Sequence, residues 1–170
     1  MRRIKDRIVL GLIAGLGANI VKEAIAETGI HSGLTKYSCR RMIPRILLNK
    51  KQANTWKGWV LGTTTDLSFA ALTGVLITYT LSYTGKDYSK LKGVVVANGV
   101  LDQVYNAFSR ILPHVRNEPN SNLLCRAIHT VFGITAASII TSLGDPTLFG
   151  KNRSLPKEGE TGKKLIPEQQ

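Results

Sequence analysis

Apolar residues along the chain are gathered into four long runs, which are separated by short segments rich in polar residues, glycine and proline. The runs cover residues 8–21, 58–85, 93–112 and 127–144. The second run is too long for a strand and shows no alternation of period two. The spacing of runs and breakers predicts helices near 7–27, 57–83, 91–112 and 122–143, with a short amphipathic helix near 38–48.

The second run gives the strongest indication that the chain lies in a membrane. Its segment LSFAALTGVLITYTLSYTG, residues 67–85, contains no formally charged side chain, and a bilayer-spanning helix needs about 20 mostly apolar residues. Trp56 and Trp59 lie at the start of the run, and Tyr79 and Tyr83 lie near its end. Aromatic residues at both ends of an apolar helix are typical of the two membrane–water interfaces.

These patterns predict an all-α membrane bundle of about four transmembrane helices, with a short interfacial helix in the first connection. The first run reaches spanning length only if it continues to about Ile25, and the third only if its polar residues face inward. Residues 1–144 would form the helical membrane domain. Residues 145–170 are too polar to bury much apolar surface, so we expect a disordered tail.

Small residues recur every four positions in the first run. A helix carries residues with this spacing on one face, and glycine or alanine there allows a second helix to approach closely. We therefore expect a helix-packing face made by Gly11, Gly15, Ala14 and Ala18.

The net charge of +12 is compatible with an anionic lipid surface or with nucleic acid. Basic residues cluster at the ends of the apolar runs, and they are not interleaved with aromatic residues that could stack on bases. The placement favours a bilayer with anionic lipids as the partner. A soluble, basic, helical nucleic-acid-binding protein remains as an alternative.

Every expected helix also carries at least one strongly polar residue. The candidates for intramembrane polar contacts are Asn19, Lys22, Asp66, Asn98, Asp102, Asn106, Arg110, Arg126 and His129. A charge in hydrocarbon is costly, so such groups face the bundle interior and form pairs. Lys22, Arg110 or Arg126 could pair with Asp66 or Asp102. We expect Asp66 to contact a polar group of another segment, and Asn98 and Asn106 of the third run are matching partners.

Sequence motifs for catalysis or cofactor binding are incomplete. Gly15 and Gly17 start a G-x-G pattern, but Ile20 occupies the position of the third glycine. The histidines are scattered, and the two cysteines, Cys39 and Cys125, do not form a metal-ligand pattern. We therefore expect no catalytic residue, no metal site, no cofactor and no enzyme activity.

Three segments carry a resemblance to a known group of proteins: DRIVLGLIAGLGANIVKEAI, LSYTGKDYSKLKG and HTVFGITAA. Together they resemble the uncharacterised small multi-span membrane proteins of clostridial and related bacteria. The resemblance covers about residues 5–143 and implies architecture, not a particular activity. This chain departs from the family in its third run, where polar residues such as Asp102 and Asn106 replace apolar ones.

These observations predict a multi-pass protein of the inner (plasma) membrane with a structural or accessory role, which could associate with itself or with another membrane protein. A small channel or transporter that uses Asp66, Asp102 and their polar neighbours is the alternative. Twelve Lys and Arg residues fall in the N-terminal arm, the 84–92 turn and the tail, against eight in the two other connections. This bias predicts cytoplasmic termini.

Overall fold

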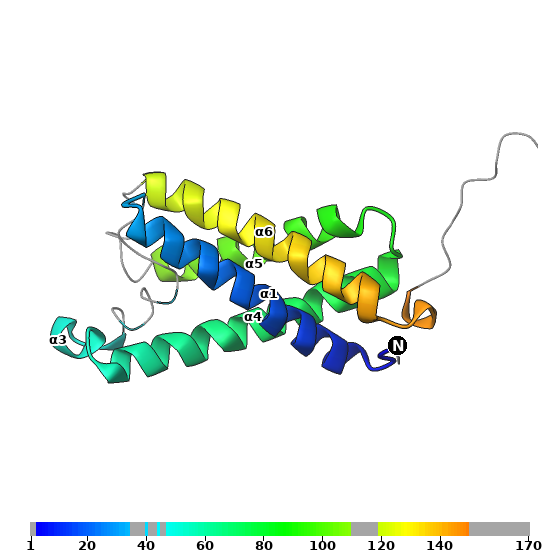
Figure 1. The fold of residues 1–170 in the computed structure, drawn as a ribbon, viewed down its shortest axis with the longest axis horizontal. Helices are drawn as coiled ribbons and strands as arrows, with labels where there is room; N and C mark the ends of the chain where they lie inside the picture. Colours follow the sequence, from blue (N-terminus) through cyan, green and yellow to red (C-terminus); the bar gives the residue numbers. More distant parts are fainter. Residues whose placement is uncertain (1–2, 35–39, 41–43, 45–46, 110–118, 150–170) are drawn as a thin grey trace, which may run out of the picture.

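The protein is built from long helices that lie side by side (Figure 1). The computed structural model describes residues 3–34, 40, 44, 47–109 and 119–149. The long helices are α1 (Arg7–His31), α4 (Trp56–Thr84), α5 (Ser89–Ser109) and α6 (Pro119–Leu143). Two short elements, α3 (Lys50–Ala53) and the 3-10 helix η2 (Pro146–Leu148), complete the described part of the chain, which contains no strand.

The all-α fold class is therefore confirmed, and the long helices lie close to the predicted positions. Among the residues that the structure describes, three helices are long and apolar enough to cross a membrane: Arg7–His31, Trp56–Thr84 and Leu123–Leu143. Helix α5 is not among them, as the polar residues of the third run suggested. The expected interfacial helix near 38–48 and residues 110–112 of the third helix lie largely outside the described residues.

Local signals explain where the helices begin and end. Asp6 caps α1, because its Oδ1 accepts hydrogen bonds from the backbone N–H groups of Ile8 and Val9 at 2.8 and 2.9 Å. Gly85, with φ of 83°, ends α4 in a conformation that favours glycine. The Nζ of Lys92 donates to the carbonyls of Thr84 and Gly85, both at 3.0 Å, and so satisfies acceptors that a helix end leaves open.

Two close helix–helix contacts depend on glycine. Between α1 and α4, a Cβ added at Gly74 would lie 2.2 Å from the carbonyl oxygen of Gly11 and 2.6 Å from the amide nitrogen of Gly15. Between α5 and α6, a Cβ at Gly93 would lie 2.4 Å from the carbonyl oxygen of Gly133. The predicted role of Gly11 and Gly15 in helix packing is confirmed, because their missing side chains let two backbones touch.

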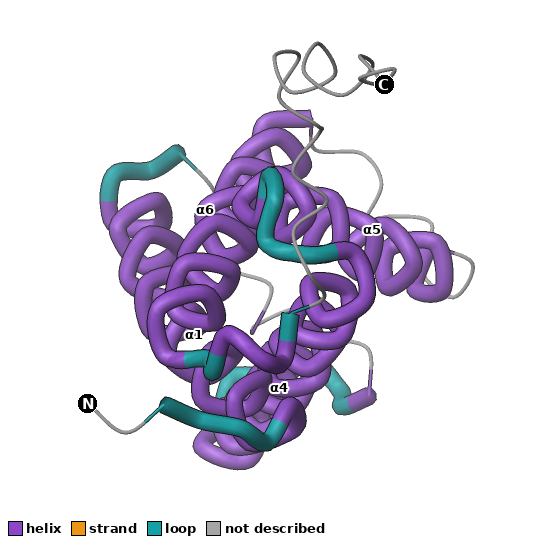
Figure 2. The backbone as a smooth tube through the Cα atoms, turned by 90° about the vertical axis from the view of Figure 1, so that its right-hand side faces the viewer, coloured by secondary structure: helices purple, strands orange, loops and turns teal. Residues whose placement is uncertain are grey.

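A core of small and medium-sized side chains fills the space between the helices. Ala14 and Ala18, the other predicted packing residues, are completely buried in this core together with Ile77, Phe132 and Ile140. Helix α1 packs against α4 and α6, and α5 packs mainly against α6 and less extensively against α4. Figure 2, which views the bundle close to end-on, shows α5 on the outer side of α6 and α4, away from α1.

The two ends of the described chain meet at one end of the bundle. The amide of Ile4 donates to the carbonyl of Leu143 at 2.9 Å, and the amide of Asp145 donates to the carbonyl of Ile4 at 3.0 Å. Leu148 and Phe149 follow directly and are buried in the core. The expected start of the polar tail at residue 145 was therefore too early, because these two apolar side chains keep the chain packed through Phe149. Residues 150–170 of that tail lie outside the described residues.

Candidate functional site

A charged cluster is buried where α1 crosses α4. The two helices run in opposite directions, so their contacts follow one register: Gly15 lies against Ala70, and one turn further along, Asn19 lies against Asp66. Residues four apart share a helix face, so the glycine contact and the polar contact belong to the same seam. The close approach at Gly15 brings two short polar side chains within bonding distance of each other.

Asp66 is satisfied at both carboxylate oxygens. Its Oδ1 accepts from the Nζ of Lys22 in a close ion pair, and its Oδ2 accepts from the Nδ2 of Asn19 at 2.9 Å. Lys22 is 4% exposed and Asp66 is 8% exposed. A buried charge is tolerated when it is paired and hydrogen-bonded, and this arrangement meets both conditions.

Further charged groups connect this pair to one end of the bundle. The Nζ of Lys22 lies 3.5 Å from Oε1 of Glu23, and the Nε of Arg40 lies 3.6 Å from Oε2 of the same glutamate. Arg40 also forms an ion pair with Glu27, one turn beyond Glu23 on α1. The acids and bases therefore alternate in a chain of contacts that runs from Glu27 to Asp66.

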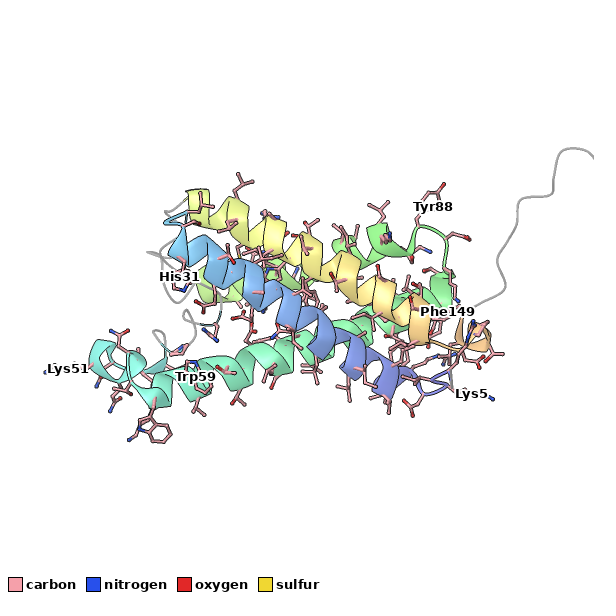
Figure 3. The ribbon with its side chains drawn as sticks, viewed as in Figure 1. Lys5, His31, Lys51, Trp59, Tyr88 and Phe149 are labelled. Carbon is pink, nitrogen blue, oxygen red and sulfur yellow. The ribbon has the colours of Figure 1, made fainter. Side chains whose placement is uncertain are left out.

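An open pocket lies at the outer end of this chain of charges. Its volume is about 470 Å³. Its lining residues include Glu27 and Arg40 of the charged cluster, and Gly58 and Trp59 at the start of α4. Figure 3 places Trp59 and Lys51 near the end of the bundle that is opposite Lys5 and Phe149. The charged cluster is thus open to solvent at Glu27 and Arg40 and closed at Asp66.

The prediction that Asp66 faces the bundle and contacts another segment is confirmed, but its expected partners on the third run were wrong. Within the described residues, the hydrogen-bond and ion-pair partners of Asp66 come from α1. The reason is packing: the glycines Gly11, Gly15 and Gly74 bring α1, rather than α5, into backbone contact with α4. The expectation that Lys22 could be its partner is borne out.

The remaining predicted polar residues lie on α5 and α6. The Nη2 of Arg126 donates to Oδ1 of Asp102 at 2.6 Å, so this expected pairing is also present. However, the two side chains are 42% and 56% exposed for Asp102 and Arg126, respectively. The expectation that the charged groups of the third run face inward was therefore wrong for Asp102, because α5 turns its small residues Gly93 and Ala97 to the core.

Two other predicted residues on α5 and α6, Asn98 and His129, also form hydrogen bonds. The Nδ2 of Asn98 donates to Oγ1 of Thr130 across the α5–α6 interface at 3.1 Å. The Nδ1 of His129 lies 2.9 Å from the carbonyl oxygen of Cys125 within α6. Asn106 is exposed on α5, and Arg110 lies outside the described residues. The predicted polar residues that the structure describes consequently form two separate groups, one buried on α1 and α4 and one partly or fully exposed on α5 and α6.

Sequence reasoning did not identify the outer part of the buried cluster. Glu23, Glu27 and Arg40 had no assigned role. The available signal was the four-residue spacing of Glu23 and Glu27, which places both carboxylates on one face of α1. Their pairing with Arg40 depends on how the first connection folds back, and spacing alone does not determine this.

The described residues contain no group of three or more His, Cys, Asp or Glu side chains that could hold a metal ion. The fold and the site define an all-helical protein with three helices able to cross a membrane and a buried ion pair between two of them. Comparisons with protein-family models, curated proteins and solved structures found no match.

Proposed function

We propose that this chain is an integral, multi-pass protein of the inner (plasma) membrane, with a structural or accessory role and no catalytic activity. The observation that carries the proposal is the distribution of side chains on α1. Ile20 is 73% exposed, whereas Lys22, two residues away, is 4% exposed. In water the free energy of burial would favour the opposite arrangement, whereas hydrocarbon solvates large apolar side chains and excludes the charge.

The same distribution is found on α4. On α1 and α4 the small residues and the charged pair face inward, and the outer surface exposes large apolar side chains that include Leu12, Ile13, Leu72 and Leu76. Large apolar side chains exposed along two long helices are typical of a surface that contacts lipid. Trp59 lies near one end of the bundle and Tyr88 near the other, as interfacial anchors would (Figure 3).

The direction of the helices supports a fourth crossing by α5. In Figure 1, α1 runs away from the end marked N, and both α4 and α6 run back toward it. If α1, α4 and α6 cross the membrane, the chain must cross once more between α4 and α6. Helix α5 has 21 residues, and at 1.5 Å per residue it is about 30 Å long, which matches the hydrocarbon thickness.

Membrane fractionation followed by an alkaline wash tests the membrane proposal. We expect the protein to remain in the membrane pellet and to be released only by detergent. Recovery in the wash would refute integral insertion and would favour the soluble, basic alternative, which predicts nucleic-acid binding that weakens steeply as salt rises.

Reporter fusions test the crossing of α5 and the orientation. A reporter inserted at residue 87 should be active in the cytoplasm, like one at the C-terminus, whereas a reporter at residue 115 should be active only on the opposite side. If the reporters at residues 87 and 115 report the same side, α5 does not cross. A C-terminal fusion that is active only outside the cytoplasm would reverse the orientation.

A second candidate function is a pathway for a proton or small cation, and one observation favours it. The open pocket leads to alternating charges that continue inward to Asp66. Purified protein in vesicles that contain a pH-sensitive dye tests this candidate. With a structural role, proton flux equals that of empty vesicles. With a pathway, flux exceeds it and the double variant Lys22→Met/Asp66→Asn, which removes both charges of the buried pair, abolishes it in protein whose helical content is unchanged.

A further inference from the structure

Helix α5 has one covered side and one open side. It packs mainly against α6 through the close contact of Gly93 with Gly133, and Ala97 and Leu101 continue this buried side along the helix. The opposite side exposes Leu91, Val95, Gly99 and Gln103. We call this open side the α5 outer face.

Gly99 is unlike the glycines at the helix contacts. A Cβ at Gly74, Gly93 or Gly133 would collide with the backbone of a neighbouring helix, whereas a Cβ at Gly99 would meet no atom within 4 Å. A glycine in a helix interior costs about 1 kcal/mol relative to alanine. Within the described fold, the missing side chain of Gly99 therefore allows no close approach to another element.

The ion pair of Asp102 and Arg126 borders the same face. Residues 95, 99, 102 and 106 are spaced at three and four positions, so they lie on one side of the helix. Asp102 and Arg126 are bonded to each other but about half exposed, unlike the buried pair of Lys22 and Asp66. At a crossing helix, this exposure would place two charged groups against lipid, and an additional protein surface would shield them.

We propose that the α5 outer face binds a second copy of the chain in a parallel, two-fold symmetric dimer. Gly99 of each copy lies next to the symmetry axis, and Asp102 of one copy lies beside Arg126 of the other. The proposal rests on the membrane insertion proposed above, because copies inserted in one orientation are related by an axis along the membrane normal.

Charge complementarity selects a second copy as the occupant. The bonded pair at the border of the face holds one acid and one base, so the border carries no net charge. A two-fold rotation therefore places each acid beside the base of the other copy without like-charge repulsion. A glycine beside the axis lets two helices approach closely. The van der Waals packing that this allows is one of the forces that drive helix association in lipid. Val95 and Leu91 then pack against the same face of the second copy.

Disulfide cross-linking of purified protein in vesicles tests this dimer. In a background with Cys39 and Cys125 replaced by alanine, Gly99→Cys should form a species of twice the monomer mass on oxidation. Leu72→Cys, on the exposed side of α4, is the control and should remain monomeric. Equal cross-linking at both positions, or none at residue 99, would overturn the proposal.

A second variant tests the contact without a new cysteine. Gly99→Leu adds a side chain into open space, so the monomer should keep its helical content and thermal stability. Energy transfer between labelled copies should show a dimerisation constant weakened about tenfold or more, equivalent to about 1.4 kcal/mol. Ser68→Leu, at an exposed position of α4, is the matched control and should leave the constant unchanged.

The two proposals can fail separately. Protein that stays in the alkaline-washed pellet but shows no energy transfer refutes the dimer and leaves membrane insertion intact. Protein that leaves the pellet refutes membrane insertion and, with it, the dimer. An equal loss of energy transfer in Gly99→Leu and Ser68→Leu would also refute the assignment of the dimer interface to α5.

Discussion

Replacing Gly74 with alanine should separate α1 from α4. The added Cβ would lie 2.2 Å from the carbonyl oxygen of Gly11 and 2.7 Å from the Cα of Gly15, whereas ordinary contacts are 3.4–4 Å. These atoms belong to the backbone of a helix, so a rotamer change cannot relieve the overlap. The two helices must therefore move apart by about 1 Å, a distance at which neighbouring contacts lose a quarter to a half of their dispersion energy.

The expected change in the free energy of unfolding of Gly74→Ala combines two opposing effects. Overpacking of a tight interface costs about 1–3 kcal/mol, and alanine in place of glycine within a helix returns up to about 1 kcal/mol. Gly99→Ala provides the same gain in helix propensity without a clash, since a Cβ there meets no atom within 4 Å. The two variants should therefore differ by about 1–3 kcal/mol in free energy of unfolding, because the propensity gain cancels between them.

The assay is unfolding of the detergent-solubilised monomer by increasing SDS, followed through the fluorescence of Trp56 and Trp59. Gly74→Ala should unfold at a lower SDS fraction than the wild type, and Gly99→Ala at the same or a higher one. Equal midpoints for both variants would show that the α1–α4 backbone contact does not limit stability, and would refute the reasoning.

Three further predictions concern charged groups. Lys22→Met leaves the buried Asp66 without its cation and should cost about 3–5 kcal/mol in the same SDS assay; adding Asp66→Leu should recover most of this loss, and no recovery would contradict a paired-charge role. Arg126→Gln breaks an exposed pair and should change the stability of the monomer by less than about 1 kcal/mol. A loss as large as that of Lys22→Met would refute the expected difference in strength between the buried and the exposed ion pair. Hydrogen bonds from Thr147 hold the pKa of Asp145 below its usual 3.8, so this contribution to stability is present above about pH 4 and is lost as pH falls through the folded pKa. Thr147→Val should raise that pKa in a carbon-13 NMR titration, and an unchanged pKa would contradict the role of the hydroxyl.

Local pattern was sufficient to predict the helices and their apolar character. Helix α1 begins at Arg7, directly after Asp6, because a capping carboxylate and an apolar run are both encoded within a few residues. The packing role of Gly11 and Gly15 also followed from their spacing, since a helix places them on one face whatever its partner is. Asp66 could be assigned to the interior because lipid excludes an unpaired carboxylate.

The sequence pattern was insufficient to predict side-chain partners, because these depend on which helices pack against each other. The sequence offered Asn98 and Asn106 as partners of Asp66, yet Asn19 and Lys22 of α1 occupy that position. Likewise, the polar residue Asp102 was expected inside and lies about half exposed. Helical spacing determines the face on which a residue lies, but it does not determine the helix that this face meets.

By itself, the sequence determined that the chain forms long apolar helices with charged groups at defined positions, because capping, periodicity and hydropathy act over a few residues. Only the tertiary structure decided which charges are buried together and which remain exposed. The physical reason is that backbone contact at Gly15 and Gly74 selects α1 as the neighbour of α4. That choice buries Lys22 beside Asp66 and leaves the open side of α5, with Asp102 at its border, for another surface to cover.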